Sequence, residues 1–441
     1  MSYRIALCSL GCAKNLVDSE RILAILKDQC FEITDQFEEA DVVIVNTCGF
    51  IESAKKESID TIIEYAALKK KNCKALVVTG CLVQKYKNVL AQEIPEVDLW
   101  LGTLDFETIG QRLTELMPHC CYREPVGNDV SYRRILTTPN HWAYVKIAEG
   151  CSNHCTFCTI PQLRGPYVSR PREEILAEVR QLIQSGVKEI ILLAQDTTVY
   201  GKDLYGRPML QELLEDLVKE NLLWIRVLYS YPARMDEALL RFMAREEKIC
   251  TYLDIPMQHS EDHVLRSMGR PERRESLRNL LAKIREIDSD FVIRSTFIVG
   301  FPGETEEDFQ GLCAFWEESV LDWVGVFPYS REEDTPAAEM AFQISEENKE
   351  ARYDYAMSFL SRCSARNLEK WLGRTVTVLV EGEIDGEEDY PYFGRTSFQA
   401  PDVDGMIYLK TKHPSDVLKP GDVVKAKVTS TDVYDLMGEI L

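Results

Sequence analysis

The chain has 441 residues, of which 45% are hydrophobic, an ordinary share for a globular protein with a sizeable core. Its length predicts two to four domains. The formal net charge of -21 disfavours a broad nucleic-acid-binding surface, which needs an excess of basic residues, and it suits either a basic partner or simple solubility. No apolar run approaches the ~20 residues that span a bilayer, so no membrane association is expected. Because the first residues, MSYRIALCSLGCAKN, are too polar for a secretory signal, we expect a soluble cytoplasmic protein.

Residues 1–118 are predicted to form the first domain, because apolar runs alternate with amphipathic helical patterns. Buried strands that alternate with helices indicate a parallel sheet. Three of these strands end in a cysteine, namely Cys12, Cys48 and Cys81. Ligands of open α/β sheets bind outside the carboxyl ends of the strands, so these cysteines can converge on one site. The alternative of three buried core cysteines is disfavoured by the Gly and Asn residues beside them, which are typical of turns.

The rest of the chain divides at changes of pattern. Residues 119–140 contain Pro, Gly and Asn without a sustained period, which predicts a linker. A second strand–helix alternation, with six strands, predicts a partial or full β/α barrel over 141–370, with its functional residues at the carboxyl ends of the strands. It ends in one long helix over 345–373. Short alternating strands with Gly, Pro and Asp turns then predict a small β-barrel over 371–441.

A cysteine-rich loop, 149-EGCSNHCTFCTIPQLRG-165, follows the first strand of the predicted β/α barrel. Cys151, Cys155 and Cys158 have C-x3-C-x2-C spacing. In a chain without a secretory signal, clustered cysteines indicate metal or redox chemistry. A zinc site would need His154 as its fourth ligand. We favour a [4Fe–4S] cluster, in which three cysteines leave one iron open to chelate a small molecule.

This spacing, with Phe157 before the last cysteine, resembles the signature of the radical S-adenosylmethionine (SAM) superfamily. The resemblance implies that Cys151, Cys155 and Cys158 hold a [4Fe–4S] cluster whose open iron binds SAM. In that superfamily the protein positions the cofactor and excludes water, while SAM and the reduced cluster generate a radical that abstracts hydrogen. A low-potential electron donor, such as a flavodoxin or ferredoxin, is implied as a partner.

Nearly the whole chain resembles the methylthiotransferases of this superfamily. Their architecture is an N-terminal domain with three cysteines, a radical SAM barrel and a C-terminal β-barrel called the TRAM domain. The resemblance implies that Cys12, Cys48 and Cys81 hold a second, auxiliary [4Fe–4S] cluster that carries or supplies the sulfur. An iron–sulfur electron carrier is an alternative, but it would not need an open iron on each cluster, and a structural zinc protein would not bind SAM.

Five segments are similar to the ribosomal-protein branch of the family: SLGCAKNLVDSERI, NTCGFIESAKKESI, LLAQDTTVYG, YLDIPMQH and RSTFIVGFPGETEEDF. That branch adds a methylthio group to the β-carbon of one aspartate in small-subunit ribosomal protein S-twelve. The branch that modifies adenosine in tRNA is the alternative function, and it has Gln and Met after the first cysteine. One departure from the ribosomal branch is Ala13, where Pro is common. Because Ala13 supplies no metal-binding atom, it leaves the assignment unchanged.

The charge of the C-terminal region supports the same choice independently. Residues 371–441 contain seven Lys or Arg and thirteen Asp or Glu. A domain that grips RNA should be basic, so this domain is expected to attract a basic ribosomal protein and no direct nucleic-acid substrate is expected. The acidic loop 381–390, EGEIDGEEDY, is the candidate contact, with a solvated turn as the alternative.

Four further residues are placed near SAM by the resemblance. Gln195 and Asp196 end the second barrel strand, near the amino group and ribose of SAM, although a structural turn would explain them too. Val299 and Gly300 lie where the fifth strand passes the adenine, and Gly permits a close backbone approach.

A few other polar residues and cysteines have alternative explanations. His259 could orient SAM or substrate, and Arg294 more plausibly forms a structural ion pair than binds a substrate carboxylate. Thr305 or a neighbour is expected to cap a helix. The other cysteines are predicted to be structural, and Cys120 and Cys121 are not assigned as ligands, because adjacent cysteines rarely bind the same iron.

Overall fold

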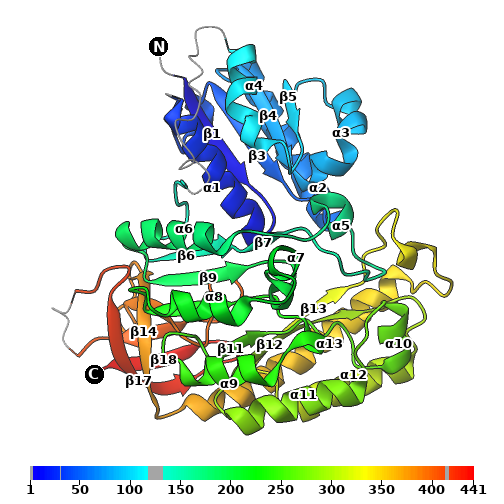
Figure 1. Cartoon of the computed structure of the whole chain (residues 1–441), viewed down its shortest axis with the longest axis vertical. Helices are drawn as coiled ribbons and strands as arrows, with labels where there is room; N and C mark the ends of the chain where they lie inside the picture. The colour runs from blue at the N-terminus through cyan, green and yellow to red at the C-terminus, as the bar shows by residue number, and fades with distance from the viewer. Residues whose placement is uncertain (1–2, 30, 118–132, 413–416) are drawn as a thin grey trace.

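The structure, a computed structural model, describes residues 3–29, 31–117, 133–412 and 417–441. It contains an N-terminal α/β domain, a central barrel of parallel strands and a C-terminal β-barrel, shown from blue through green to red in Figure 1. This mixed α/β architecture confirms the predicted fold class. The last part of the predicted linker is described over 133–140, which has no regular secondary structure, and residues 119–132 lie outside the described residues.

The N-terminal domain is built on a five-stranded parallel sheet with the strand order β2-β1-β3-β4-β5. The strands are β1 (Arg4–Ser9), β2 (Glu32–Ile33), β3 (Val42–Thr47), β4 (Ala75–Gly80) and β5 (Leu99–Leu101). The helices are α1 (Ala13–Asp28), α2 (Glu52–Ala66), α3 (Cys81–Glu93) and α4 (Ile109–Leu116). Separate apolar cores lie on the two faces of the sheet, because residues such as Val42 and Val43 point to opposite sides of β3.

The central domain has six parallel strands. They are β6 (Trp142–Lys146), β9 (Glu189–Leu193), β10 (Trp224–Val227), β11 (Tyr252–Asp254), β12 (Val292–Val299) and β13 (Trp323–Pro328). Two three-stranded sheets, β10-β9-β6 and β11-β12-β13, are joined by a parallel bridge between Ile225 and Ile249. Within the described residues β6 and β13 do not pair, so the barrel is open at this point. Of the two predicted forms, partial and full, the structure has the partial barrel.

Helices cover the outside of this barrel. They are α6 (Arg172–Gln184), α7 (Lys202–Tyr205), α8 (Leu210–Leu217), α9 (Glu237–Arg245), α10 (Asp262–Ser267), α11 (Arg274–Ile287), α12 (Glu306–Ser319) and α13 (Glu346–Leu368). As predicted, Thr305 caps α12: its hydroxyl accepts from the amide of Asp308, whose carboxylate accepts in return. The long helix α13 begins at its cap Ser345, and the chain turns away at Gly373 with φ of 75°.

The C-terminal domain is a closed barrel with the strand order β14-β15-β16-β18-β17. The strands are β14 (Thr375–Glu383), β15 (Tyr392–Thr396), β16 (Ile407–Lys410), β17 (Val423–Thr431) and β18 (Leu436–Ile440). All pairs are antiparallel except β16 with β18. Closure pairs every strand on both sides, which removes exposed sheet edges.

This small barrel closes the amino-terminal end of the central barrel. The segment 397–404 between β15 and β16 lies against residues at or near the starts of the central strands. The indole of Trp323 donates to the carbonyl of Phe398 (3.1 Å), and the hydroxyl of Tyr252 donates to Asp404 (2.7 Å). The C-terminal barrel therefore leaves the carboxyl ends of the central strands uncovered, and a site is expected at those ends. The N-terminal domain faces them.

Candidate functional site: two groups of three cysteines

The first cysteine group lies in the loop between the short strand β7 (Ala148–Glu149) and helix α5 (Ile160–Arg164). The loop is anchored at Thr156, whose hydroxyl donates to the carbonyl of Ser267 (2.7 Å). The ring of Phe157 packs edge-on against Phe301 with centroids 6.4 Å apart. Cys151, Cys155 and Cys158 are all partly exposed, and the three thiols lie close enough to act on one another electrostatically.

Two polar groups approach the sulfur atoms of this loop. The amide of Asn153 lies 3.4 Å from Sγ of Cys151, and the guanidinium of Arg270 lies 4.0 Å from Sγ of Cys155. Burial raises the pKa of the Cys158 thiol to about 12. Because a metal binds the thiolate, metal binding must release this proton.

The second cysteine group lies at the carboxyl ends of β1, β3 and β4. Cys12 caps α1, Cys48 follows β3, and Cys81 begins α3. Gly11 has a φ of 85°, and a Cβ at this position would lie 2.7 Å from Cβ of Cys48, so only glycine permits this approach. The three cysteines are thus brought to one edge of the sheet, as their positions after three strands predicted.

Two of the three cysteines of the second group are buried, whereas those of the first are partly exposed. Cys48 is 8% exposed and Cys81 is 5% exposed, whereas Cys12 is open to solvent. Burial raises the pKa of the Cys81 thiol to about 12, although Arg164 acts in the opposite direction. The Nε of Arg164 lies 3.3 Å from Sγ of Cys81, a charged donor directed at the sulfur.

The chemistry of the two groups suits iron–sulfur clusters better than single ions. Among the described residues, no three His, Cys, Asp or Glu side chains are arranged to hold one metal ion. A single zinc ion needs its sulfur ligands within about 2.3 Å of the metal. A four-iron cluster takes one thiolate per iron, so its ligands are spread more widely. Thiol ligands with N–H donors beside the sulfur are the surroundings in which such clusters are stabilised.

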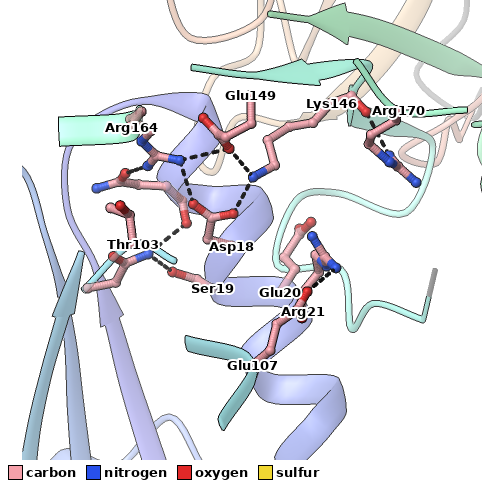
Figure 2. A network of polar contacts seen from close by, with 12 residues as sticks. Asp18, Ser19, Glu20, Arg21, Thr103, Glu107, Lys146, Glu149, Arg164 and Arg170 are labelled. Carbon is pink, nitrogen blue, oxygen red and sulfur yellow. Dashed lines mark hydrogen bonds and ion pairs between the residues drawn. The ribbon is translucent and has the colours of Figure 1, made fainter. Parts of the chain in front are cut away.

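A buried polar network joins the two groups across the domain boundary (Figure 2). Arg164, which ends α5, donates to Asp18 of α1 (2.8 Å) and to Glu149 of β7 (3.1 Å). It also donates to the side chain of Asn15. Lys146 of β6 contacts the same two carboxylates, at 2.7 Å from Glu149. Burial alone would raise the pKa of Glu149, but Lys146 and Arg164 hold it well below its usual range. Arg164 therefore touches a cysteine of one group while it follows the last cysteine of the other by six residues.

Lys14 lies in the same region. It is the second residue of α1, and its side chain is 7% exposed. Its ammonium lies over the ring of Tyr229, 4.4 Å from the centroid, just after the end of β10. Its charge acts on Cys12 and on Cys158, one cysteine from each group. The contact brings the start of α1 to the carboxyl-terminal mouth of the barrel.

Asp196 lies beside the first cysteine group, and Gln195 precedes it, whereas their predicted contacts with SAM stay a prediction. Asp196 is 1% exposed and accepts from Asn153 (3.1 Å) and from the guanidinium of Arg234. It also accepts from the amide of Thr198, which is the turn-forming alternative. Oε1 of Gln195 is buried without a hydrogen-bond partner among the described residues. An open hollow of about 410 Å³ adjoins them, lined by Cys151, Ser152, Asn153, Tyr167, Asp196, Val199, Lys202, Asp203 and Arg234.

Val299 ends β12 and Gly300 follows it, and their proposed place under the adenine stays a prediction. Val299 is fully buried in the apolar core of the barrel. Gly300 has a φ of 73°, and a Cβ here would lie 2.5 Å from Cγ of Lys349, so the close approach at this glycine is to a lysine of α13. Its amide donates to the buried carboxylate of Glu304 (2.9 Å).

His259 and Arg294 are both in contact with carboxylates of the chain, and Nε2 of His259 has no hydrogen-bond partner among the described residues. His259 is fully buried: its Nδ1 accepts from the amide of Glu261 (3.0 Å), and its Nε2 lies 3.5 Å from Glu304. Arg294 pairs with Asp254 (3.2 Å) and with Asp404 (3.4 Å), the structural ion pair that was favoured. The remaining described cysteines form no disulfide, while Cys30, Cys120 and Cys121 lie outside the described residues.

Sequence reasoning missed Lys14 and Arg164. Both lie next to a cysteine motif, in GCAKN and in QLRG, and this proximity was the available signal. Their contacts depend on the packing of the N-terminal domain on the barrel, because Asn15 and Arg164 are 149 residues apart.

Three family matches follow the three domains of the structure. Residues 4–102 match Uncharacterized protein family UPF0004, residues 145–315 match the Radical SAM superfamily, and residues 372–441 match the TRAM domain. The two cysteine groups lie in the first and second of these regions. A radical SAM enzyme with a cysteine-bearing N-terminal domain and a TRAM domain is therefore the class that the fold and the site define.

Curated relatives identify the family within this class. A protein of Clostridioides difficile named "Ribosomal protein uS12 methylthiotransferase RimO" is 46% identical over 446 residues, which cover 99% of each chain. Proteins of the same name from Acetivibrio thermocellus and Desulforamulus reducens are 45% and 47% identical, with 100% and 99% of this chain and 99% of each relative covered. The chain belongs to the RimO family of radical SAM methylthiotransferases.

Solved structures are similar in fold at low sequence identity. The radical SAM methyltransferase TsrM of Kitasatospora setae, with cobalamin and a [4Fe-4S] cluster bound, has a TM-score of 0.57 at 15% identity, covering 76% of this chain and 77% of its own. The cobalamin-dependent SAM radical enzyme OxsB has a TM-score of 0.50 at 12% identity, covering 81% of this chain and 56% of its own.

Across the described residues, no helix is long and apolar enough to cross a membrane.

Proposed function

We propose that this enzyme replaces one hydrogen on the β-carbon of an aspartate of small-subunit ribosomal protein S-twelve with a methylthio group. The proposal extends the name of the relatives, which specifies a methylthiotransferase of protein uS12, to the residue and the carbon atom. The observation that carries it is the pairing of two three-cysteine groups across one domain boundary, with Arg164 in contact with Cys81 and close behind Cys158 in the chain.

Each cysteine group has a proposed role. Cys151, Cys155 and Cys158 would hold the [4Fe–4S] cluster that binds SAM, at the carboxyl ends of the barrel strands where such sites lie. Cys12, Cys48 and Cys81 would hold the auxiliary [4Fe–4S] cluster. When bound, SAM and its cluster supply hydrogen-atom abstraction, and the auxiliary cluster supplies sulfur. No general acid or base is assigned, because removal of a hydrogen atom from carbon needs none.

The chain's own residues would position these groups. Phe157 closes one side of the first loop against Phe301. Asp196, held by Asn153 and Arg234, and Gln195, with its unpaired buried oxygen, would orient the polar end of SAM. The hollow of about 410 Å³ beside Cys151 provides room for the bound molecules.

Charge supports a protein substrate over the alternative, adenosine in tRNA. The hairpin between β14 and β15 presents five exposed acidic residues, namely Glu383, Asp385, Glu387, Glu388 and Asp389. These would attract a basic ribosomal protein and repel RNA phosphates. The side chain of Glu381, at the start of the predicted acidic loop, is instead 9% exposed and bonded to His141 (2.8 Å) and Arg395 (2.7 Å), so we exclude it from the proposed contact. We also propose a cytoplasmic location, with a flavodoxin or ferredoxin as electron donor.

One experiment tests substrate and reaction together. Intact masses of ribosomal proteins are compared between cells with and without this gene. S-twelve from cells with the gene should be heavier by about 46 Da, the methylthio group minus one hydrogen that this radical chemistry adds. An unchanged mass of S-twelve, together with loss of a methylthio nucleoside from tRNA, would refute the proposal in favour of the alternative.

A further inference from the structure

Lys14 differs from every other buried lysine of the described chain in lacking an anionic partner. Four lysines are at most 9% exposed: Lys14, Lys55, Lys146 and Lys349. Three of them form ion pairs, at 2.9 Å to Glu332, 2.7 Å to Glu149 and 2.7 Å to Glu346 respectively. Lys14 makes no ion pair and no hydrogen bond from its ammonium to any described residue, and its one polar contact is the face of Tyr229. A buried charge normally requires a partner, so an anion is missing here.

The surroundings make this cation more costly. Lys14 is the second residue of α1, where the helix dipole is positive and disfavours a cation. The positive charges of Arg164 and Lys146 also act on it. Glu149 is within electrostatic range, but Arg164 and Lys146 already occupy that carboxylate. The thiol of Cys12 would also act favourably on the ammonium if it were charged, but Cys12 is a proposed cluster ligand. No described residue therefore forms an ion pair with Lys14.

The position of Lys14 indicates which ligand would supply the anion. It follows Cys12 by two residues, and its charge also acts on Cys158. Tyr229 beneath it belongs to the carboxyl-terminal mouth of the barrel. Lys14 thus lies between the two cysteine groups. The reacting carbon of a substrate must enter this region if it is to lie close to both groups.

We propose that Lys14 binds the side-chain carboxylate of the aspartate that is modified. This inference rests on the proposed function, since it assigns a residue to the substrate named there. In aspartate the carboxylate is bonded directly to the β-carbon, so an ammonium that holds the carboxylate also fixes the carbon. A lysine ammonium is a compact charge on a flexible stem, and the ring of Tyr229 limits its directions. Lys14 would make the enzyme select aspartate over a neutral residue of the same shape.

The test measures binding of cluster-loaded enzyme to two proteins, S-twelve and S-twelve with the target aspartate changed to asparagine. Wild-type enzyme should bind the asparagine protein about 10-fold to 100-fold more weakly, the usual effect of losing one charge-assisted contact. Lys14→Met, which keeps the length of the stem, should bind both proteins equally weakly. Lys14→Arg should retain a preference for aspartate. Lys55→Met, at a buried lysine outside the site, is the control and should discriminate as the wild type does.

Iron content, visible absorbance and substrate-free formation of 5′-deoxyadenosine show whether each variant keeps its clusters. If Lys14→Met discriminates between the two proteins as strongly as the wild type, the assignment of Lys14 is wrong. If Lys14→Met loses its clusters, Lys14→Arg decides: equal binding of both proteins overturns the assignment, and retained preference supports it. Absence of discrimination by the wild type also overturns it. The mass of S-twelve from cells tests the proposed function separately, because it does not depend on how the carboxylate is bound.

Discussion

Replacing Arg164 with methionine is expected to loosen the N-terminal domain from the barrel while both keep their folds. Figure 2 shows the guanidinium between Asp18 on α1 and Glu149 on β7. It also donates to Asn15 on α1 and to Cys81 on α3. Methionine fills much of the same space but leaves the two carboxylates with Lys146 as their remaining cation. The side chain of Arg164 is 3% exposed, so solvent screens these interactions little.

The size of the effect follows from the burial of the network. Removing one member of a buried ion pair costs about 3–5 kcal/mol, because the other charge is left without compensation. Lys146 still neutralises part of the negative charge, so the lower end, about 3 kcal/mol, is expected for opening the contact. This corresponds to about a hundredfold change in the opening equilibrium.

Amide hydrogen exchange measures this opening locally. Peptides from α1, α5 and β7 should exchange about a hundredfold faster in Arg164→Met, while peptides from the C-terminal barrel are unchanged. Arg207→Met is the matched control, since Arg207 is 62% exposed and pairs with Glu212 at the surface. The Arg207→Met substitution should change the free energy of opening by less than about 1 kcal/mol, which is about a fivefold change in exchange rate. Adding Asp18→Asn to Arg164→Met should restore part of the protection. If Arg164→Met exchanges like Arg207→Met, the network does not hold the two domains together.

Three further outcomes are expected. Cys155→Ala should abolish formation of 5′-deoxyadenosine. Cys48→Ala should still form 5′-deoxyadenosine from SAM but should transfer no methylthio group. Full methylthiolated product from Cys48→Ala would show that the auxiliary cluster has no part in the mechanism. Neutralising the exposed acids of 383–389 should weaken binding to S-twelve mainly at low salt, and an unchanged affinity would reduce the hairpin to a solvated turn. Burial alone would raise the pKa of Glu381, but His141 and Arg395 lower it, so its contribution to stability is present above pH 4.5 and lost on acidification. The melting temperatures of wild type and Glu381→Gln should therefore converge as the pH falls below 4.5, and parallel curves would contradict this.

The arrangement of strands was predictable because buried parallel strands leave continuous apolar runs in the sequence. Cys12, Cys48 and Cys81 were recognised from the same signal, since each ends such a run. The strand β2 was missed, because Glu32–Ile33 has two residues and no periodicity to detect. Local patterns therefore predicted the elements that bury many residues and failed for this two-residue strand.

Contacts between distant segments were beyond the sequence. Within the predicted linker, Arg134 is buried between Glu20 (3.7 Å) and Glu178 (3.3 Å), and nothing in its neighbours distinguishes it from a solvated arginine. Asp402 and Asp404 were counted with the surface charge of the C-terminal domain. The side chain of Asp404 is instead fully buried and accepts from Tyr252, because the segment that carries it packs against the starts of the central strands. Asp402 is exposed, yet it too accepts from a tyrosine of the central barrel, Tyr144.

The contacts of Glu381 also constrain how a protein substrate would be presented. Glu381 lies near the end of β14, just before the acidic hairpin, and it bonds to His141 at the start of β6. The same strand leads through Lys146 to the loop that carries Cys151. Five residues of β6 span about 16 Å at 3.3 Å per residue. A partner anchored on the hairpin must therefore extend along the whole barrel to place an aspartate between the cysteine groups. A folded protein with a projecting loop can bridge this length, whereas a free amino acid or nucleoside cannot, so binding at the hairpin would require a macromolecular substrate.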